Sequence, residues 1–256
     1  MIQKNNTARR VRIPTAAAFA AILCACALLC SCVIFNNAGK SGEKQTVEAP
    51  KDPIAVKNVS AGTILDFFAD VAIGSEYGDG GNVVCKWTKR VKYYIDGDAT
   101  DDDRELISRL CEELNGIEGF PGIGEVSSES AANMIVMFVD RDEIPKLFEH
   151  ADAKCGGMAQ YEWDSSTGEI KSARCAIDKA LGADRRNTVC EEFIQALGPA
   201  KDSYMFTESV FYQGYTLMPF PSELDFAVVR MLYSPRIPAG TPRLEAISLA
   251  AQLLEW

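Results

Sequence analysis

The spacing of apolar residues in the first half of the chain predicts two helices and two short strands. Apolar side chains recur at helical intervals over residues 63–73 and again over residues 106–114. Thr100 and the acidic residues after it are typical of a helix start, so the second helix is expected to begin there. Residues 83–87 and 91–95 are rich in β-branched and aromatic side chains, which predicts either the two strands of a hairpin or one bent strand.

The second half of the chain predicts further strands and then helices. Residues 133–139, NMIVMFV, form an unbroken apolar run of strand length, as expected of a central strand buried on both faces. Residues 158–163 and 170–177 flank the turn-forming stretch DSSTG, a combination that predicts a hairpin. Residues 185–197 form a helical pattern that ends at a Gly-Pro pair, a usual helix stop.

Two more helices are expected near the C-terminus, over residues 223–233 and 243–254. The predicted order is therefore β–α–β–β–β–α followed by a helical C-terminal part. This order predicts an α+β fold with a mixed sheet and a central helix at residues 185–197.

The N-terminus has the pattern of a secretory signal. Four basic side chains precede an uncharged run over residues 13–31. The run leads into LCSC at residues 29–32, which resembles the bacterial lipobox, so Cys32 is expected to carry the lipid. LCAC at residues 23–26 also fits, but cleavage before Cys32 leaves a full-length apolar region. The alternative is an uncleaved transmembrane anchor, since the run is nearly long enough to cross a bilayer.

Three parts are expected along the chain. Residues 1–31 are the lipoprotein signal peptide, residues 32–60 are a flexible tether, and residues 61–256 are a single domain. The domain would lie outside the cytoplasm, held by its N-terminal lipid to the bacterial cell membrane. Without the signal, 22 basic side chains remain against 36 acidic ones, a net charge of −14. Such an acidic protein is not expected to bind nucleic acid.

Residues 190–198, CEEFIQALG, have the length and rhythm of the HExxH helix of zinc peptidases. In that helix, two side chains four residues apart bind one metal, and the glutamate between them acts on metal-bound water. Glu191 and Gln195 occupy the two ligand positions here, and Glu192 occupies the position of the general base. The stretch is also an ordinary amphipathic helix, with these three side chains opposite the apolar side.

With this motif, the order of elements resembles the zincin fold, and in particular its metzincin branch. Gly198 stands where the HExxHxxGxxH pattern has its glycine. The third ligand position holds Lys201, which cannot bind a metal, and Asp202 follows it. Residues 209–212, SVFY, resemble the turn beneath the metal, with Phe211 in place of the usual methionine.

A closer resemblance is to an exported bacterial family known as domain of unknown function 2927. It rests on CEEFIQALG, the DS pair at 202–203, Asp225 and the LYSP stretch at 232–235. In that family, EExxQ stands where zincins have HExxH. The resemblance is sharpest over residues 188–240 and extends loosely back to Phe67. It implies a zincin-like fold and brings no established activity.

The donor atoms of the motif decide which metals it suits. Catalytic zinc is usually held by imidazole or thiolate, whereas Glu191 and Gln195 offer only oxygen. We therefore expect no metal at the HExxH-equivalent positions and no cofactor. Of the metal ions, oxygen-only ligation suits a hard divalent cation such as Mg²⁺, Ca²⁺ or Mn²⁺.

Three functions are compatible with these residues. In the first, the domain is a pseudo-peptidase whose cleft binds a peptide or a cell-wall polymer. In the second, it is a rewired hydrolase with Glu192 as general base, while Glu191, Gln195 and Asp202 hold a cation or the substrate. In the third, it is a structural interaction module of the envelope. The first is preferred, because the ligand chemistry argues against metal hydrolysis.

Burial distinguishes these functions. Two glutamates in a cleft would favour the hydrolase, and two exposed ones would favour the structural module. An unpaired strand edge, expected at residues 173–175, would favour capture of a peptide by strand addition.

Five cysteines remain in the domain after removal of the signal and lipidation of Cys32. Export makes disulfides possible, although an odd number leaves at least one thiol free. As a hypothesis, Cys155 pairs with Cys190 and joins the motif helix to the loop before it, and Cys85 with Cys111 is the next candidate.

Overall fold

The structure, a computed structural model, describes residues 53–74 and 82–254. The predicted signal peptide, the lipidation site Cys32 and most of the predicted tether lie outside these residues. Within the two described ranges, no helix combines the length and the apolar character needed to cross a bilayer.

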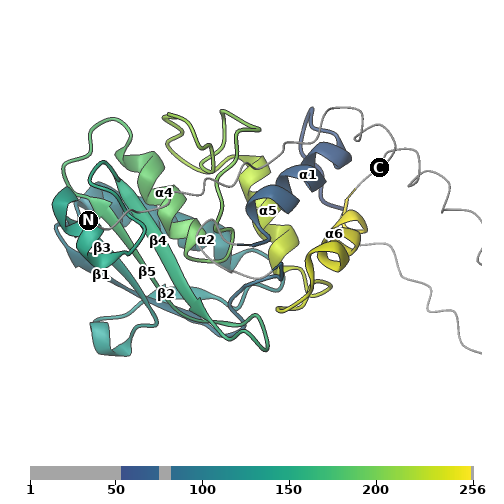
Figure 1. The fold of residues 1–256 in the computed structure, drawn as a ribbon, viewed down its shortest axis with the longest axis horizontal. Coiled ribbons are helices and arrows are strands. Elements are labelled where there is room, and N and C mark those ends of the chain that lie inside the picture. The colour runs from purple at the N-terminus through teal and green to yellow at the C-terminus, as the bar shows by residue number, and fades with distance from the viewer. Residues whose placement is uncertain (1–52, 75–81, 255–256) are drawn as a thin grey trace, which may run out of the picture. The chain divides into compact units, whose positions relative to one another are not determined.

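A mixed sheet lies at the centre of the fold, and in the described residues its five strands have the order β2-β1-β3-β5-β4 (Figure 1). The strands β2, β1, β3 and β5 run parallel to one another, and β4 pairs antiparallel with β5. The strands are β1 Val91–Gly97, β2 Ile123–Glu125, β3 Met134–Val139, β4 Gly157–Trp163 and β5 Ile170–Asp178.

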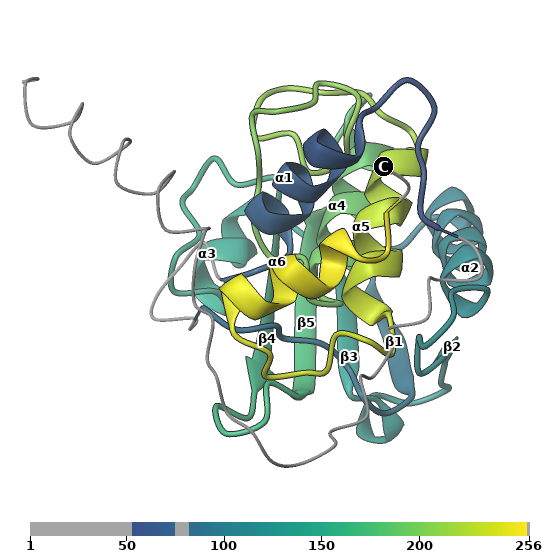
Figure 2. The ribbon, with the colours of Figure 1, turned by 90° about the vertical axis from the view of Figure 1, so that its right-hand side faces the viewer.

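Two of the helices, α2 and α4, pack side by side, and α4 also contacts β4 and β5 (Figure 1). The N-terminal helix α1 packs against α5 and α6 of the C-terminal part (Figure 2). The helices are α1 Ala61–Val71, α2 Asp101–Asn115, α3 Ile144–Leu147, α4 Arg185–Gln195, α5 Glu223–Tyr233 and α6 Arg243–Ala251, with 3₁₀ turns η2 Glu129–Ala131 and η3 Arg141–Glu143.

The main core lies on the face of the sheet that α2 and α4 cover. Val136 of β3 is fully buried there, and Phe193 of α4 meets Tyr93 of β1 edge-on with 5.7 Å between the ring centroids. A smaller cluster, in which Ile144 of α3 packs near Ala176 of β5, lies apart from the main core. Because α3 has only four residues, one side of β3 is fully buried and the other half-buried, not both buried as predicted.

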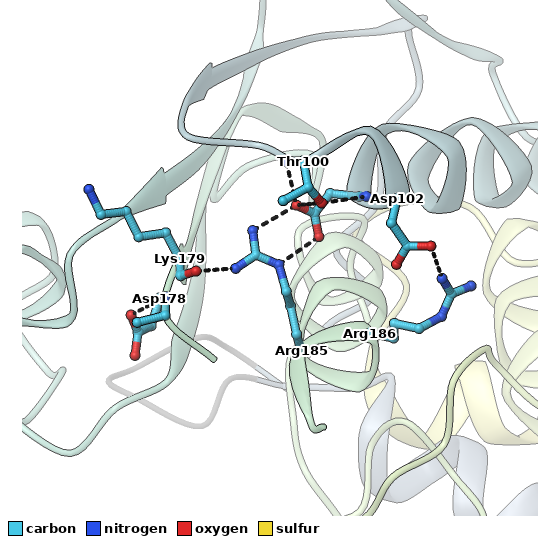
Figure 3. Close-up of polar contacts among 8 residues, drawn as sticks. Thr100, Asp102, Asp178, Lys179, Arg185 and Arg186 are labelled. Atoms are coloured by element: carbon cyan, nitrogen blue, oxygen red, sulfur yellow. Dashed lines mark hydrogen bonds and ion pairs between the residues drawn. The ribbon is translucent and has the colours of Figure 1, made fainter. Parts of the chain in front are cut away.

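A charged junction fixes the start of α4 against the start of α2 and the end of β5 (Figure 3). The guanidinium of Arg185 donates from Nε and Nη2 to the two oxygens of Asp103, at 2.8 and 2.7 Å, and from Nη1 to the Lys179 carbonyl. Asp103 also accepts from the amide and hydroxyl of Thr100, which completes the capping box of α2. The junction therefore sets where the motif helix begins.

The sequence predictions of an α+β fold, of the β4–β5 hairpin and of β3 as the central strand are confirmed. Neither alternative predicted for residues 83–87 and 91–95 is found. No hairpin forms, because β2 and β3 occupy both edges of β1, and there is no single bent strand, because β1 begins at Val91 and residues 83–87 make only isolated bridges. Lys86 instead donates its amide to the Gly168 carbonyl and accepts from the amide of Ile170, at 3.1 and 3.0 Å.

The last part of the predicted tether packs on the domain. The amide of Ile54 donates to the Leu253 carbonyl at 2.7 Å, and Val56 and Val59 contact the core. Ser60 caps α1 by accepting from the Thr63 amide at 3.1 Å. The packed structure therefore begins before residue 61.

Candidate functional site

A groove of about 510 Å³ lies between α4, the start of β4 and two loops. The helix provides one wall, and the residues around the start of β4 provide another. The groove is lined by Arg141, Lys154–Met158, Leu181, Asp184, Asn187, Thr188, Glu191, Glu192, Gln195, Asp202 and Tyr212–Thr216.

All four residues singled out in the motif region line this groove: Glu191, Glu192, Gln195 and Asp202. Glu192 is only 7 % exposed, and Glu191 is half-buried. Gln195 donates from Nε2 to Oδ1 of Asp202 at 2.6 Å, so the helix is joined to the loop that follows it. The polar side of this amphipathic helix therefore faces a groove.

Gly157 allows β4 to approach α4 closely at this point. A Cβ atom on Gly157 would lie 2.5 Å from Cγ2 of Thr188, and 2.6 and 2.8 Å from Oε1 and Cγ of Glu192. A Cβ atom does not approach other non-bonded heavy atoms this closely, so only glycine fits without movement of the helix side chains. Gly157 thus determines how deeply Glu192 sits between the helix and the strand.

The donors present do not fit zinc. The helix offers only the oxygens of Glu191 and Gln195 where zinc peptidases have imidazoles. Lys201, at the third ligand position, does not line the groove; its amide donates to the Val71 carbonyl, and its side chain passes Gly74. Among the described residues, no three histidine, cysteine or acidic side chains are grouped as a metal site requires.

The stretch that resembles a turn beneath a metal has a structural role. Asp225 is fully buried and accepts from the Ser209 hydroxyl, from the Val210 amide at 3.2 Å and from the Ser222 amide at 2.8 Å. Burial raises the pKa of Asp225 more than these hydrogen bonds lower it. The bonds join the start of α5 to the loop that contributes Asp202 and residues 212–216 to the groove.

Two groove residues in the turn of α4 before the motif were not predicted. Asn187 and Thr188 precede Glu191 and Glu192 by four residues each, so the helical repeat was the signal that could have found them. Asn187 is only 6 % exposed, and its Nδ2 has no hydrogen-bond partner among the described residues. A buried amide donor in the wall of a groove is suited to a ligand that brings an acceptor.

The loop on the far side of the groove exposes large apolar side chains. Tyr204 and Tyr215 are 76 % and 74 % exposed, and Met205 and Leu217 are also exposed. Tyr204 meets Tyr212 edge-on at 6.3 Å between ring centroids. Exposed aromatic side chains beside a groove are typical of a binding surface.

The predicted disulfide is not formed in this structure, where the cysteines of the described residues are free thiols. Cys155 donates to the Gly157 carbonyl at 2.6 Å, whereas Cys190 faces the Pro219 carbonyl at 3.9 Å. Burial, and then the Glu192 carboxylate, raises the pKa of Cys155 to about 11. Cys155 is half-buried in the groove, and Cys190 is fully buried.

The open edge of the sheet next to the groove belongs to β4. The strand with residues 173–175 is β5, which lies between β3 and β4, so the prediction that it supplies a free edge is wrong. Its partner on that side is β4, with Ala173 opposite Tyr161. No strand of the described part of the chain pairs with the outer edge of β4.

Comparison with protein families shows a match over most of the domain. The family model described as Protein of unknown function (DUF2927) matches residues 61–252, which include every residue that lines the groove. Comparison with curated proteins gives no match.

Proposed function

This chain belongs to the DUF2927 family, and we propose that it is a lipid-anchored protein of the bacterial cell envelope that binds an extended peptide in the groove between α4 and β4. One observation carries the proposal: the groove lies beside the start of a strand whose outer edge is unpaired in the described residues. Such an edge offers main-chain donors and acceptors to a peptide that adds as a further strand.

The lining of the groove supports a binding role. Tyr215 gives an incoming chain a large exposed apolar surface, and Asn187 gives it a buried donor. The antiparallel edge strand above the motif helix agrees with a zincin-like arrangement, while Glu191 and Gln195 do not suit zinc. A pseudo-peptidase, which keeps the cleft without zinc catalysis, accounts for both features.

A second candidate function is peptide hydrolysis with Glu192 as general base. It is favoured by the position of Glu192, which lines the groove at 7 % exposure, because a general base must lie within reach of a bound substrate. Glu191, Gln195 and Asp202 would hold the substrate. The same burial argues against a purely structural module, which would not need carboxylates within a groove.

Binding is tested with a peptide array of varied sequence, probed with the full chain purified in detergent. We expect a subset of peptides to bind the native protein and to bind Tyr215→Ala less well. Leu244→Ala is the matched control, since Leu244 is 83 % exposed and does not line the groove. No binding to any peptide, or equal loss in both variants, would contradict the proposal.

The bound peptides are then incubated with the protein and their masses measured. Intact peptides support a binding protein, whereas cleavage that is lost in Glu192→Gln establishes the hydrolase. Anchoring is measured separately by incorporation of labelled fatty acid, which we expect in the native protein and not in Cys32→Ala.

A further inference from the structure

We infer that the peptide bound in this groove carries a cationic side chain, which binds against the carboxylates of Glu191, Glu192 and Asp202, while the amide of Asn187 donates to a carbonyl of the ligand. This inference rests on the proposed peptide-binding function and specifies its ligand. The cationic group of the ligand is a primary ammonium, as in lysine, or a guanidinium, as in arginine.

The charges of the groove are unevenly divided. Four acidic side chains line it, those named above and Asp184, against the two basic side chains of Arg141 and Lys154. Arg141 is already engaged, since its Nε donates to Asp178 at 2.7 Å. Lys154 is exposed, in the loop before β4. The lining of the groove therefore carries more acidic than basic side chains, which attracts an incoming cation.

Asn187 gives a second and independent indication of a ligand. Its side chain is more than nine-tenths buried in the wall of the groove, and its Nδ2 lacks a hydrogen-bond partner in the described residues. A buried amide donor without a partner costs about 1–3 kcal/mol, and a carbonyl of a bound peptide removes that cost. A metal ion would not, because Nδ2 of an amide is a donor and not a metal ligand.

The arrangement of the carboxylates also favours an organic cation over a metal. A metal requires several oxygen atoms within about 2.0–2.6 Å of one point, and the described residues contain no such group of side chains. Ammonium and guanidinium groups bind acceptors that are spread apart, at about 2.7–3.2 Å from each nitrogen. The negative field reaches into the groove, since burial and then Glu192 raise the pKa of Cys155.

The test uses fluorescein-labelled decapeptides that differ only at one central position: Lys, Arg, Gln or Glu. Binding to the full chain in detergent is followed by fluorescence anisotropy, at about 20 mM and about 300 mM NaCl. We expect the Lys and Arg peptides to bind at least about tenfold more tightly than the Gln peptide at low salt. Glu191→Gln, and separately Asp202→Asn, should reduce this preference, whereas Glu105→Gln, an exposed acid of α2 outside the groove, should keep it.

Asn187→Ala should instead weaken all four peptides by a similar factor, roughly fivefold. If the four peptides bind the native protein equally, the cationic ligand is wrong while the proposed peptide-binding function stands. If none of them binds and the array is also negative, both are wrong. A preference that survives in both carboxylate variants would place the cation elsewhere and overturn the inference.

Discussion

Replacing Gly157 with alanine should destabilise the protein and displace Glu192 within the groove. Gly157 does not adopt a positive φ, so its backbone accepts an alanine and the effect is purely steric. The new Cβ would lie 2.5 Å from Thr188 Cγ2, and 2.6 and 2.8 Å from atoms of Glu192. Carbon atoms in contact are normally about 3.5–4.0 Å apart, so these side chains must move by about 1 Å.

The expected cost follows from two opposing effects. Extra atoms in a packed contact cost about 1–3 kcal/mol, and the lower entropy of the unfolded chain returns about 0.4–1 kcal/mol. The net loss should be roughly 1–2 kcal/mol, which for a domain of this size lowers the melting temperature by about 2–4 °C per kcal/mol. Peptide affinity should fall as well, since the displaced Glu192 is part of the groove wall.

The free energy of unfolding is measured by urea denaturation, followed by tryptophan fluorescence. Gly62→Ala is the matched control, because Gly62 lies in α1 and, apart from its chain neighbours and the backbone of the helix itself, no atom stands within 4 Å of the place that a Cβ would take there. That variant should be more stable by about 0.4–1 kcal/mol, because alanine fits this helical backbone and lowers the entropy of the unfolded chain. The two glycine-to-alanine changes should therefore have opposite signs.

A second variant isolates the contact. Thr188→Ser removes the Cγ2 atom nearest to the new Cβ, so in the Gly157→Ala background it should restore part of the lost stability. The reasoning is refuted if Gly157→Ala matches the native protein in both stability and peptide affinity, or if Thr188→Ser brings no recovery.

Three further predictions concern the junction, the core and the groove thiol. Arg185→Met should cost about 3–5 kcal/mol of unfolding free energy at pH 7, because it leaves the Asp103 carboxylate buried without its cation. Burial alone would raise the pKa of Asp103, but the bonds from Arg185 and the capping threonine outweigh it and lower that pKa. The Arg185–Asp103 pair therefore contributes its full stability at pH values above the unfolded-state pKa of Asp103, about 3.9, and loses it as the pH falls through the lower folded-state pKa. The unfolding free energies of the native and variant proteins, measured by urea denaturation, should therefore converge in acid. Lys86→Met should lower the free energy of unfolding by about 1–3 kcal/mol or more in the same assay, because the Lys86 ammonium donates to three buried carbonyls around the end of α5. A loss below about 0.5 kcal/mol, which is roughly the scatter of surface substitutions, would contradict this expectation. Alkylation of Cys155 by iodoacetamide, measured by mass spectrometry, should accelerate about tenfold per pH unit above neutrality. It should also be faster in Glu192→Gln, because that change removes a negative charge that raises the Cys155 pKa. An unchanged rate in this variant would show that the Glu192 carboxylate does not influence the Cys155 thiol.

The hydrophobic pattern located most elements because each has a strong local signal. The capping threonine of α2, the turn between β4 and β5 and the glycine after α4 are local features, and the structure uses all three. β2 was missed because its three residues are too few to show an alternation. Residues 83–87 were paired wrongly because strand-like composition does not specify a partner, and β2 and β3 left β1 no free edge.

The sequence by itself determined the α+β class, the family and the position of the motif on a helix. It also predicted one candidate site from four residues, Glu191, Glu192, Gln195 and Asp202, because the helical repeat and the following turn keep them close together. Only the tertiary structure decided that these residues face a groove, that β4 and not β5 supplies the open edge, and that Cys155 and Cys190 are separate. The physical reason is that these outcomes depend on which surfaces pack together, as at Gly157 against α4, and a contact between distant segments leaves no periodic signal in either of them.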